Sequence, residues 1–187
     1  MLIMLVSLLV EDTNGTVSLL SVLYAAASLT YLILNTGIRK ILVFDVCRSA
    51  LLTLAGTLLF HFMAILFGAP LVRSIERTAR FSLLLSLMTV TPASVFLKFD
   101  SDKWFRLFLL WRPLTMGERL LIVSSVGAVV GAWLGAFVIP LDWERPWQVW
   151  PISCVVGAVA GHLVACTVGA IGLLAYKFYC RERTKLL

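Results

Sequence analysis

Long apolar runs without a charged side chain dominate this sequence. Asp, Glu, Lys and Arg are absent from five runs: residues 13–38, 51–72, 81–97, 120–141 and 146–176. A helix needs about 20 residues to cross a ~30 Å hydrocarbon core, so each run reaches or approaches spanning length. The opening MLIMLVSLLV ends at Glu11 and is interpreted as a short or truncated first span.

These runs predict an all-α polytopic integral membrane protein, with one transmembrane helical domain over residues 1–187 and about six transmembrane helices joined by short loops. The expected spans are 1–10 (partial), 17–36, 49–69, 80–97, 119–140 and 150–177. The segment WFRLFLLW is too short to span, carries Trp at both ends and is flanked by basic residues. It predicts an interfacial helix over 103–112.

The basic residues favour one orientation. Six spans would place residues 39–48, 98–119 and 177–185 on one side of the membrane, and these segments hold twelve of the 16 Lys and Arg. The loops on the opposite side hold the other four, Arg73, Arg77, Arg80 and Arg145. Because cytoplasmic loops collect Lys and Arg, the C-terminus is predicted to be cytoplasmic and the loops near Asn14, Arg73 and Asp142 lumenal. With 60% hydrophobic and 14% charged residues, the net charge of +6 reflects topology, and nucleic acid is not an expected partner.

Glycines recur at helical spacing in the last two spans. Gly127, Gly131 and Gly135 lie on one face, and Gly157 and Gly161 repeat the spacing. Small residues at i and i+4 allow close helix packing in lipid. Either these two spans pack on each other, or a groove receives a helix of another protein; the working hypothesis for function uses the second alternative.

The link between these spans, which we call the Trp-Pro turn (residues 140–151), is dense in special residues. Its prolines constrain the backbone, and its tryptophans are typical of the headgroup level. The turn is a structural clamp, a partner-docking site, or a lipid contact in which the charged residues pair internally or hold a headgroup with an amine and a phosphate. The candidates are Pro140, Asp142, Trp143, Glu144, Arg145, Pro146, Trp147, Trp150 and Pro151.

Catalytic and metal-binding patterns are not found in the sequence. There is no paired acidic cluster within a span, no DHHC or HExxH and no Gly-rich phosphate loop, and the four cysteines lack CxxC spacing. We therefore predict no catalytic residue, no metal and no cofactor. His61 and His162 are interpreted as hydrogen-bonded interior residues making intramembrane polar contacts.

The segment GAWLGAFVIPLDWERPWQVWPISC, Gly131 to Cys154, resembles the signature of the PIG-F family, and LFGAPLV at Leu66 to Val72 resembles a second family turn. The resemblance covers roughly residues 50–175. It implies a noncatalytic, multi-pass endoplasmic reticulum protein that binds and stabilises glycosylphosphatidylinositol (GPI) ethanolamine-phosphate transferases.

In that family setting the transferase carries out the chemistry, with phosphatidylethanolamine as donor and the second or third mannose of the anchor precursor as acceptor. The expected partners are thus a catalytic transferase subunit and a membrane lipid, such as phosphatidylethanolamine. The alternative is a lipid-handling membrane enzyme or flippase, acting on phosphatidylethanolamine or a GPI precursor through Asp142, Glu144 and Arg145.

Overall fold

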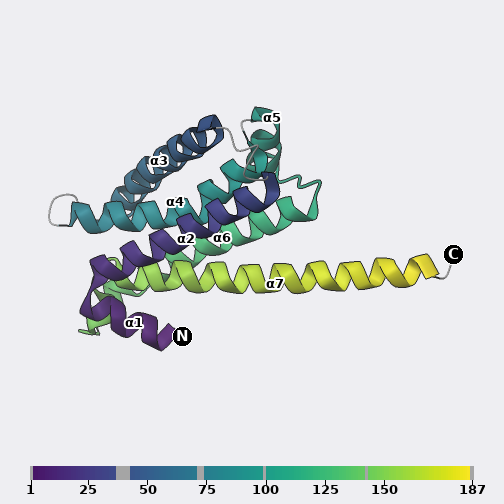
Figure 1. Ribbon diagram of the computed structural model, residues 1–187. Helices are drawn as coiled ribbons and strands as arrows, with labels where there is room; N and C mark the ends of the chain where they lie inside the picture. Colours follow the sequence, from purple (N-terminus) through teal and green to yellow (C-terminus); the bar gives the residue numbers. More distant parts are fainter. Residues whose placement is uncertain (1, 37–42, 71–73, 99, 142, 186–187) are drawn as a thin grey trace.

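The computed structural model describes residues 2–36, 43–70, 74–98, 100–141 and 143–185, and within these ranges every regular element is helical, as predicted (Figure 1). The α-helices are α1 Leu2–Glu11, α2 Thr13–Thr36, α3 Val43–Leu66, α4 Ile75–Leu97, α5 Ser101–Trp104, α6 Met116–Phe137 and α7 Ile152–Lys185. Shorter turns are the π-helix η2 Phe105–Leu109 and the 3₁₀ helices η3 Ile139–Leu141 and η4 Pro146–Gln148.

Four helices of the described residues are long and apolar enough to cross a membrane. They are Phe44–Leu66, Ile75–Leu97, Met116–Leu141 and Ile152–Tyr179. These helices support a polytopic membrane protein, whereas the predicted number of six spans is not confirmed.

The first two helices are separated at Asp12. Its carboxylate accepts a hydrogen bond from the Gly15 amide at 2.9 Å, which caps the start of α2. The ten residues of α1 extend only ~15 Å at 1.5 Å per residue, about half of the hydrocarbon thickness. Leu9 of α1 is fully buried, so this short helix is anchored to the rest of the bundle.

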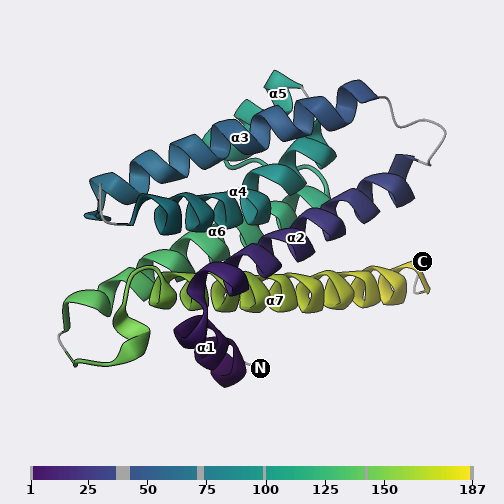
Figure 2. The ribbon, with the colours of Figure 1, turned by 60° about the vertical axis from the view of Figure 1, so that its left-hand side comes forward.

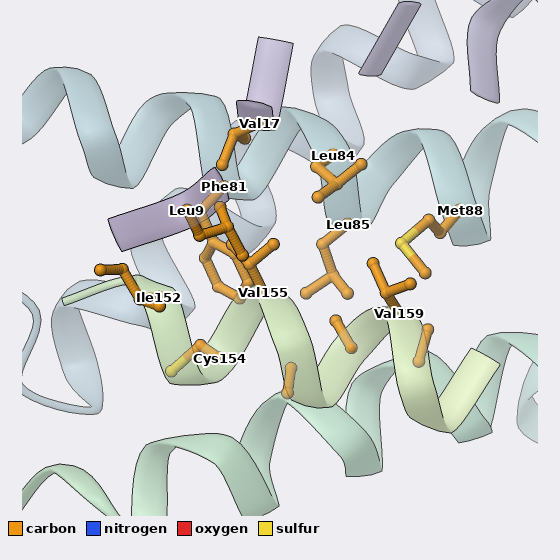
Figure 3. Close-up of a cluster of buried hydrophobic side chains, with 13 residues drawn as sticks. Leu9, Val17, Phe81, Leu84, Leu85, Met88, Ile152, Cys154, Val155 and Val159 are labelled. Atoms are coloured by element: carbon orange, nitrogen blue, oxygen red, sulfur yellow. The ribbon is translucent and has the colours of Figure 1, made fainter. Parts of the chain in front are cut away.

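The larger helices form a row in which α3 packs on α4, α4 on α6 and α6 on α7, with α2 against α4 (Figure 2). The contact between α6 and α7 is the most extensive. The main core lies between α4 and α7, where Phe81, Leu85, Val155 and Val159 meet, and Leu9 closes one end (Figure 3). In Figure 1 the C-terminal half of α7 runs past the ends of the other helices.

Hydroxyl groups join α3 to α4. Ser86 Oγ donates to the Thr53 carbonyl at 2.7 Å, and the Thr53 and Thr91 hydroxyls lie 2.7 Å apart. Gly56 allows the approach, because a Cβ there would lie 2.6 Å from Ser86 Oγ. Thr91 of this polar contact precedes Pro92, which lies inside α4 and lacks an amide donor.

The segment α5–η2 covers the ends of α4 and α6. Leu107 is fully buried in a second core cluster with Leu97 and Leu121. Trp104 donates from Nε1 to the Lys98 carbonyl at 2.9 Å and stacks on Phe108. Helical structure thus occurs within the predicted interfacial range 103–112, and its position in the interface stays a prediction.

Candidate functional site

The five predicted glycines meet at the contact between α6 and α7. A Cβ on Gly131 would lie 2.9 Å from the carbonyl carbon of Gly157 and 3.1 Å from Gly161 Cα. A Cβ on Gly127 would lie 2.6 Å from the Gly161 carbonyl oxygen, and one on Gly135 would lie 2.9 Å from Cys154 Cα. Apart from Ala165 Cβ beside Gly127, the neighbours are backbone atoms, so the two helices approach each other without room for a side chain.

This geometry corrects the working hypothesis for the glycines. The faces at Gly127 to Gly135 and Gly157 to Gly161 cover each other, so neither is open to a helix of a second protein. In lipid, such backbone-level packing is a main source of helix association. The glycines therefore hold together the two helices that carry the Trp-Pro turn, and a partner surface has to be sought elsewhere.

The inner side of the Trp-Pro turn is fixed by two side chains. Gln148 is 8% exposed, donates to the Val138 carbonyl at 3.0 Å and accepts from the Arg145 amide at 3.0 Å. Trp150 donates from Nε1 to the Thr78 hydroxyl of α4 at 3.0 Å, and its ring meets Phe81 edge-on. Thus α4, α6 and α7 are tied together at this end of the bundle.

The outer side of the same turn is exposed. The side chains of Pro140, Trp143, Glu144, Arg145 and Pro146 are exposed, with 54% exposure for Trp143. Asp142 lies outside the described residues, and the described part of the chain contains no ion pair between Glu144 and Arg145.

Two further candidates lie partly or fully inside the turn. Trp147 is half-buried and packs edge-on against Trp143, with ring centroids 5.8 Å apart. Pro151 is fully buried and follows a cis peptide bond after Trp150. The structure therefore separates the eight described candidates into an outward group and an inward group.

A neighbouring contact was not predicted from the sequence. Arg80 of α4, counted only as a topology charge, donates from Nη1 to the Asn14 carbonyl and to Ser18 Oγ, both at 3.1 Å. It also pairs with Glu76. This network joins the start of α2 to α4 near the Trp-Pro turn. The i, i+4 spacing of Glu76 and Arg80 in the sequence could have predicted their ion pair, but not the contacts of Arg80 with α2.

The two histidines have different surroundings. His162 lies with Nδ1 3.2 Å from the Ser124 carbonyl of α6, and Tyr24 of α2 meets its ring edge-on. Its Nε2 lies 3.6 Å from Cys166 Sγ, a residue that sequence reasoning did not single out although it follows four positions later. His61 does not match the expectation of a hydrogen-bonded residue at Nδ1, because this buried atom has no partner among the described residues.

An ion pair fixes the start of α6. Arg106 of η2 binds Glu118 through both guanidinium nitrogens, at 2.7 and 3.1 Å, and the Leu114 amide donates to the same carboxylate at 2.6 Å. Hydrogen bonding to Glu118 raises the pKa of Arg106. Thr115 and Glu118 also form a reciprocal capping box. Glu118 thereby holds the interfacial segment to α6.

The described residues contain no group of three or more His, Cys, Asp and Glu side chains that could hold a metal ion. The geometry of the Trp-Pro turn is instead that of a rigid surface feature: its inner side is bound to three helices, and its outer side presents an aromatic ring and charges. Such a surface is suited to recognition.

The sequence model of the GPI biosynthesis protein family Pig-F matches residues 1–170. The chain belongs to this family. Its PIG-F region includes α1 to α6, the Trp-Pro turn and the first half of α7. No solved structure matches the chain.

Curated relatives of this PIG-F family member carry informative names. It is 40% identical over 112 residues to a human protein named GPI ethanolamine phosphate transferase, stabilizing subunit, covering 60% of this chain and 51% of the relative. A Yarrowia lipolytica relative named glycosylphosphatidylinositol anchor biosynthesis protein 11 is 34% identical over 137 residues, covering 73% and 59%.

A third relative, from Schizosaccharomyces pombe, is named PIGF/3-ketodihydrosphingosine reductase fusion protein; it is 44% identical over 118 residues, covering 63% of this chain and 24% of the relative. In the human and Yarrowia comparisons the chain spans about half the length of the curated relatives it matches.

Proposed function

We propose that this protein is a noncatalytic subunit that binds and stabilises a GPI ethanolamine-phosphate transferase in the endoplasmic reticulum membrane. The observation that carries the proposal is family membership over residues 1–170, together with a human relative named as the stabilizing subunit of that transferase. The transferase would add ethanolamine phosphate to the second or third mannose of the anchor precursor, with phosphatidylethanolamine as the donor lipid.

The outer side of the Trp-Pro turn is the surface we assign to the transferase. Its exposed Trp143 supplies apolar area with little conformational freedom to lose, and Arg145 beside it supplies a charged donor; Trp and Arg are the residue types that dominate binding energy at interfaces. The bonds of Gln148 and Trp150 hold the backbone in place before binding, which lowers the ordering cost of association.

The proposed orientation places this surface where a lumenal catalytic domain can reach it. The excess of Lys and Arg on the other side supports a cytoplasmic C-terminus and a lumenal Trp-Pro turn. The turn connects α6 and α7, which pack together at their glycines. A partner bound at the turn is therefore attached to a rigid pair of membrane helices. Binding there would stabilise the transferase, because the subunit binds the folded transferase and not the unfolded one. The unfolding equilibrium of the transferase then shifts towards the folded state.

The experiment is purification of the detergent-extracted chain from cells, with mass spectrometry of the retained proteins. The wild-type chain should retain a transferase, and the double variant Trp143→Ala, Arg145→Ala should lose it. Phe67→Ala is the matched control, because Phe67 is 69% exposed near the same predicted side but belongs to another element.

Each result has a definite meaning. Absence of a transferase from the wild-type preparation contradicts the proposed function. Retention by the double variant, with the wild type positive, contradicts the assignment of the surface and leaves the function in place. A lipid-handling enzyme, the second candidate, would require turnover of phosphatidylethanolamine by the purified chain alone, and such turnover would replace the accessory role.

A further inference from the structure

A pocket of about 310 Å³ lies along the middle of α6, beside α4 and the segment α5–η2. The aromatic side chains of Trp104, Phe108 and Trp111 line it from the interfacial segment, and Val126 and Val129 line it from α6. Its volume is at the lower end of the range of small-molecule sites, about 300–1,000 Å³. A lining of this composition accommodates an apolar group beside a row of interfacial tryptophans.

Two arginines without an acidic partner in the described part of the chain are close in the sequence to residues that line this pocket. Arg119 precedes Ile122 and Val126 by three and seven residues, which places it on the pocket-facing side of α6, and Arg112 follows Trp111. Both arginines are exposed, and neither has an acidic partner among the described residues. By contrast, Arg106 is neutralised by Glu118.

A buried hydroxyl behind the pocket wall also has no partner. Ser125 is 7% exposed and lines the pocket, and its Oγ makes no hydrogen bond within the described residues. The hydroxyls of Thr89 and Ser124 nearby both donate to helix carbonyls, at 2.8 and 3.1 Å. An unpaired buried hydroxyl is costly. The surface that the pocket exposes is nevertheless entirely apolar, so Ser125 adds no polar contact for a ligand and the pocket suits a hydrocarbon chain.

We propose that this pocket holds one acyl chain of an anionic glycerophospholipid from the adjacent leaflet, with its phosphate against Arg112 and Arg119. Unpaired positive charge beside interfacial aromatics favours an anionic lipid over the alternative occupant, an apolar helix of a partner protein. The site goes beyond the proposed function, because it requires no transferase.

The test uses the full chain in phosphatidylcholine nanodiscs that contain a trace of phospholipid with a photoactivatable acyl chain. Phosphatidylserine and phosphatidylcholine probes are compared, and the labelled residues are identified by mass spectrometry. We expect the serine probe to label Val126 and Val129 more strongly than the outward residues Leu51 and Leu58 of α3, which are 67% and 64% exposed.

Variants separate a built site from ordinary lipid contact. Arg112→Gln and Arg119→Gln should each lower pocket labelling by the serine probe about fivefold and leave labelling by the choline probe unchanged. Val126→Trp should occlude the pocket, whereas Val123→Trp should not, because Val123 is 41% exposed on α6 but does not line it.

Equal labelling of the pocket and of α3 would overturn the proposal, as would equal effects of the two tryptophan variants. Loss of pocket labelling upon binding of a transferase, with a crosslink from the pocket to a transferase helix, would assign the space to that helix and also overturn it. The transferase-binding experiment is independent, so the failure of either proposal is recognised separately.

Discussion

Replacing Gly131 by alanine adds one methyl group where α6 and α7 meet backbone to backbone. The new Cβ would lie 2.9 Å from the Gly157 carbonyl carbon, while ordinary contact begins at 3.4 Å. The helices must therefore separate by at least 0.5 Å, the difference between these values. Overpacking of this kind costs about 1–3 kcal/mol, which lowers the melting temperature by about 2–12 °C for a chain of this size.

Gly172 of α7 provides a matched control. It has no heavy atom within 4 Å of the position of an added Cβ, so alanine there meets open space. In a helix interior, alanine is favoured over glycine by up to about 1 kcal/mol. We therefore expect Gly172→Ala to leave stability unchanged or to raise it slightly, opposite in sign to Gly131→Ala.

The assay is thermal unfolding of the purified chain in detergent, followed by the reaction of Cys154 with a fluorescent maleimide. Cys154 is 1% exposed and lies in the core near the start of α7, so it reacts only when the bundle opens. The other cysteines are replaced by serine. Equal melting temperatures for wild type and Gly131→Ala, or equal shifts for the two alanine variants, would refute the close contact between α6 and α7.

Three further predictions use the same chain. Glu118→Ala should lower the melting temperature, and adding Arg106→Leu should recover part of the loss, because the second change removes the charge left without its partner; additive effects would contradict the pairing. Trp150→Phe and Thr78→Val should show a coupling of about 1 kcal/mol in a double-mutant cycle, and no coupling would argue against their hydrogen bond. Val149→Cys in microsomes should resist an impermeant maleimide until permeabilisation, unlike a cysteine appended to the C-terminus; the reverse pattern would invert the topology.

The helices were largely predictable, because a helix that lies in lipid requires a long apolar run in the sequence. The ends of the helices were less predictable. Helix α3 begins at Val43, ahead of the charge-free run, and includes Asp45 and Arg48, which pair at 3.9 Å. Charged residues can extend a membrane helix beyond its apolar part when they face one another or water, and hydropathy alone does not record this.

The site was predicted only in part. The spacing of the glycines indicated a close contact, but the choice between an internal and an external partner depended on how α6 and α7 fold back on each other. The bond between Trp150 and Thr78 joins residues 72 positions apart, and the Arg80 contact with Asn14 spans 66. Packing sets such pairs, and no local pattern in a single sequence predicts them.

We propose that this chain stabilises a transferase without carrying out its chemistry. The most direct measurement follows the lifetime and activity of the catalytic transferase subunit, produced in membranes with this chain, without it, or with the double variant Trp143→Ala, Arg145→Ala. We predict a longer lifetime with the wild-type chain, a short lifetime in the other two cases, and no ethanolamine-phosphate transfer by the chain alone. An unchanged lifetime, or transfer by the isolated chain, would contradict the account.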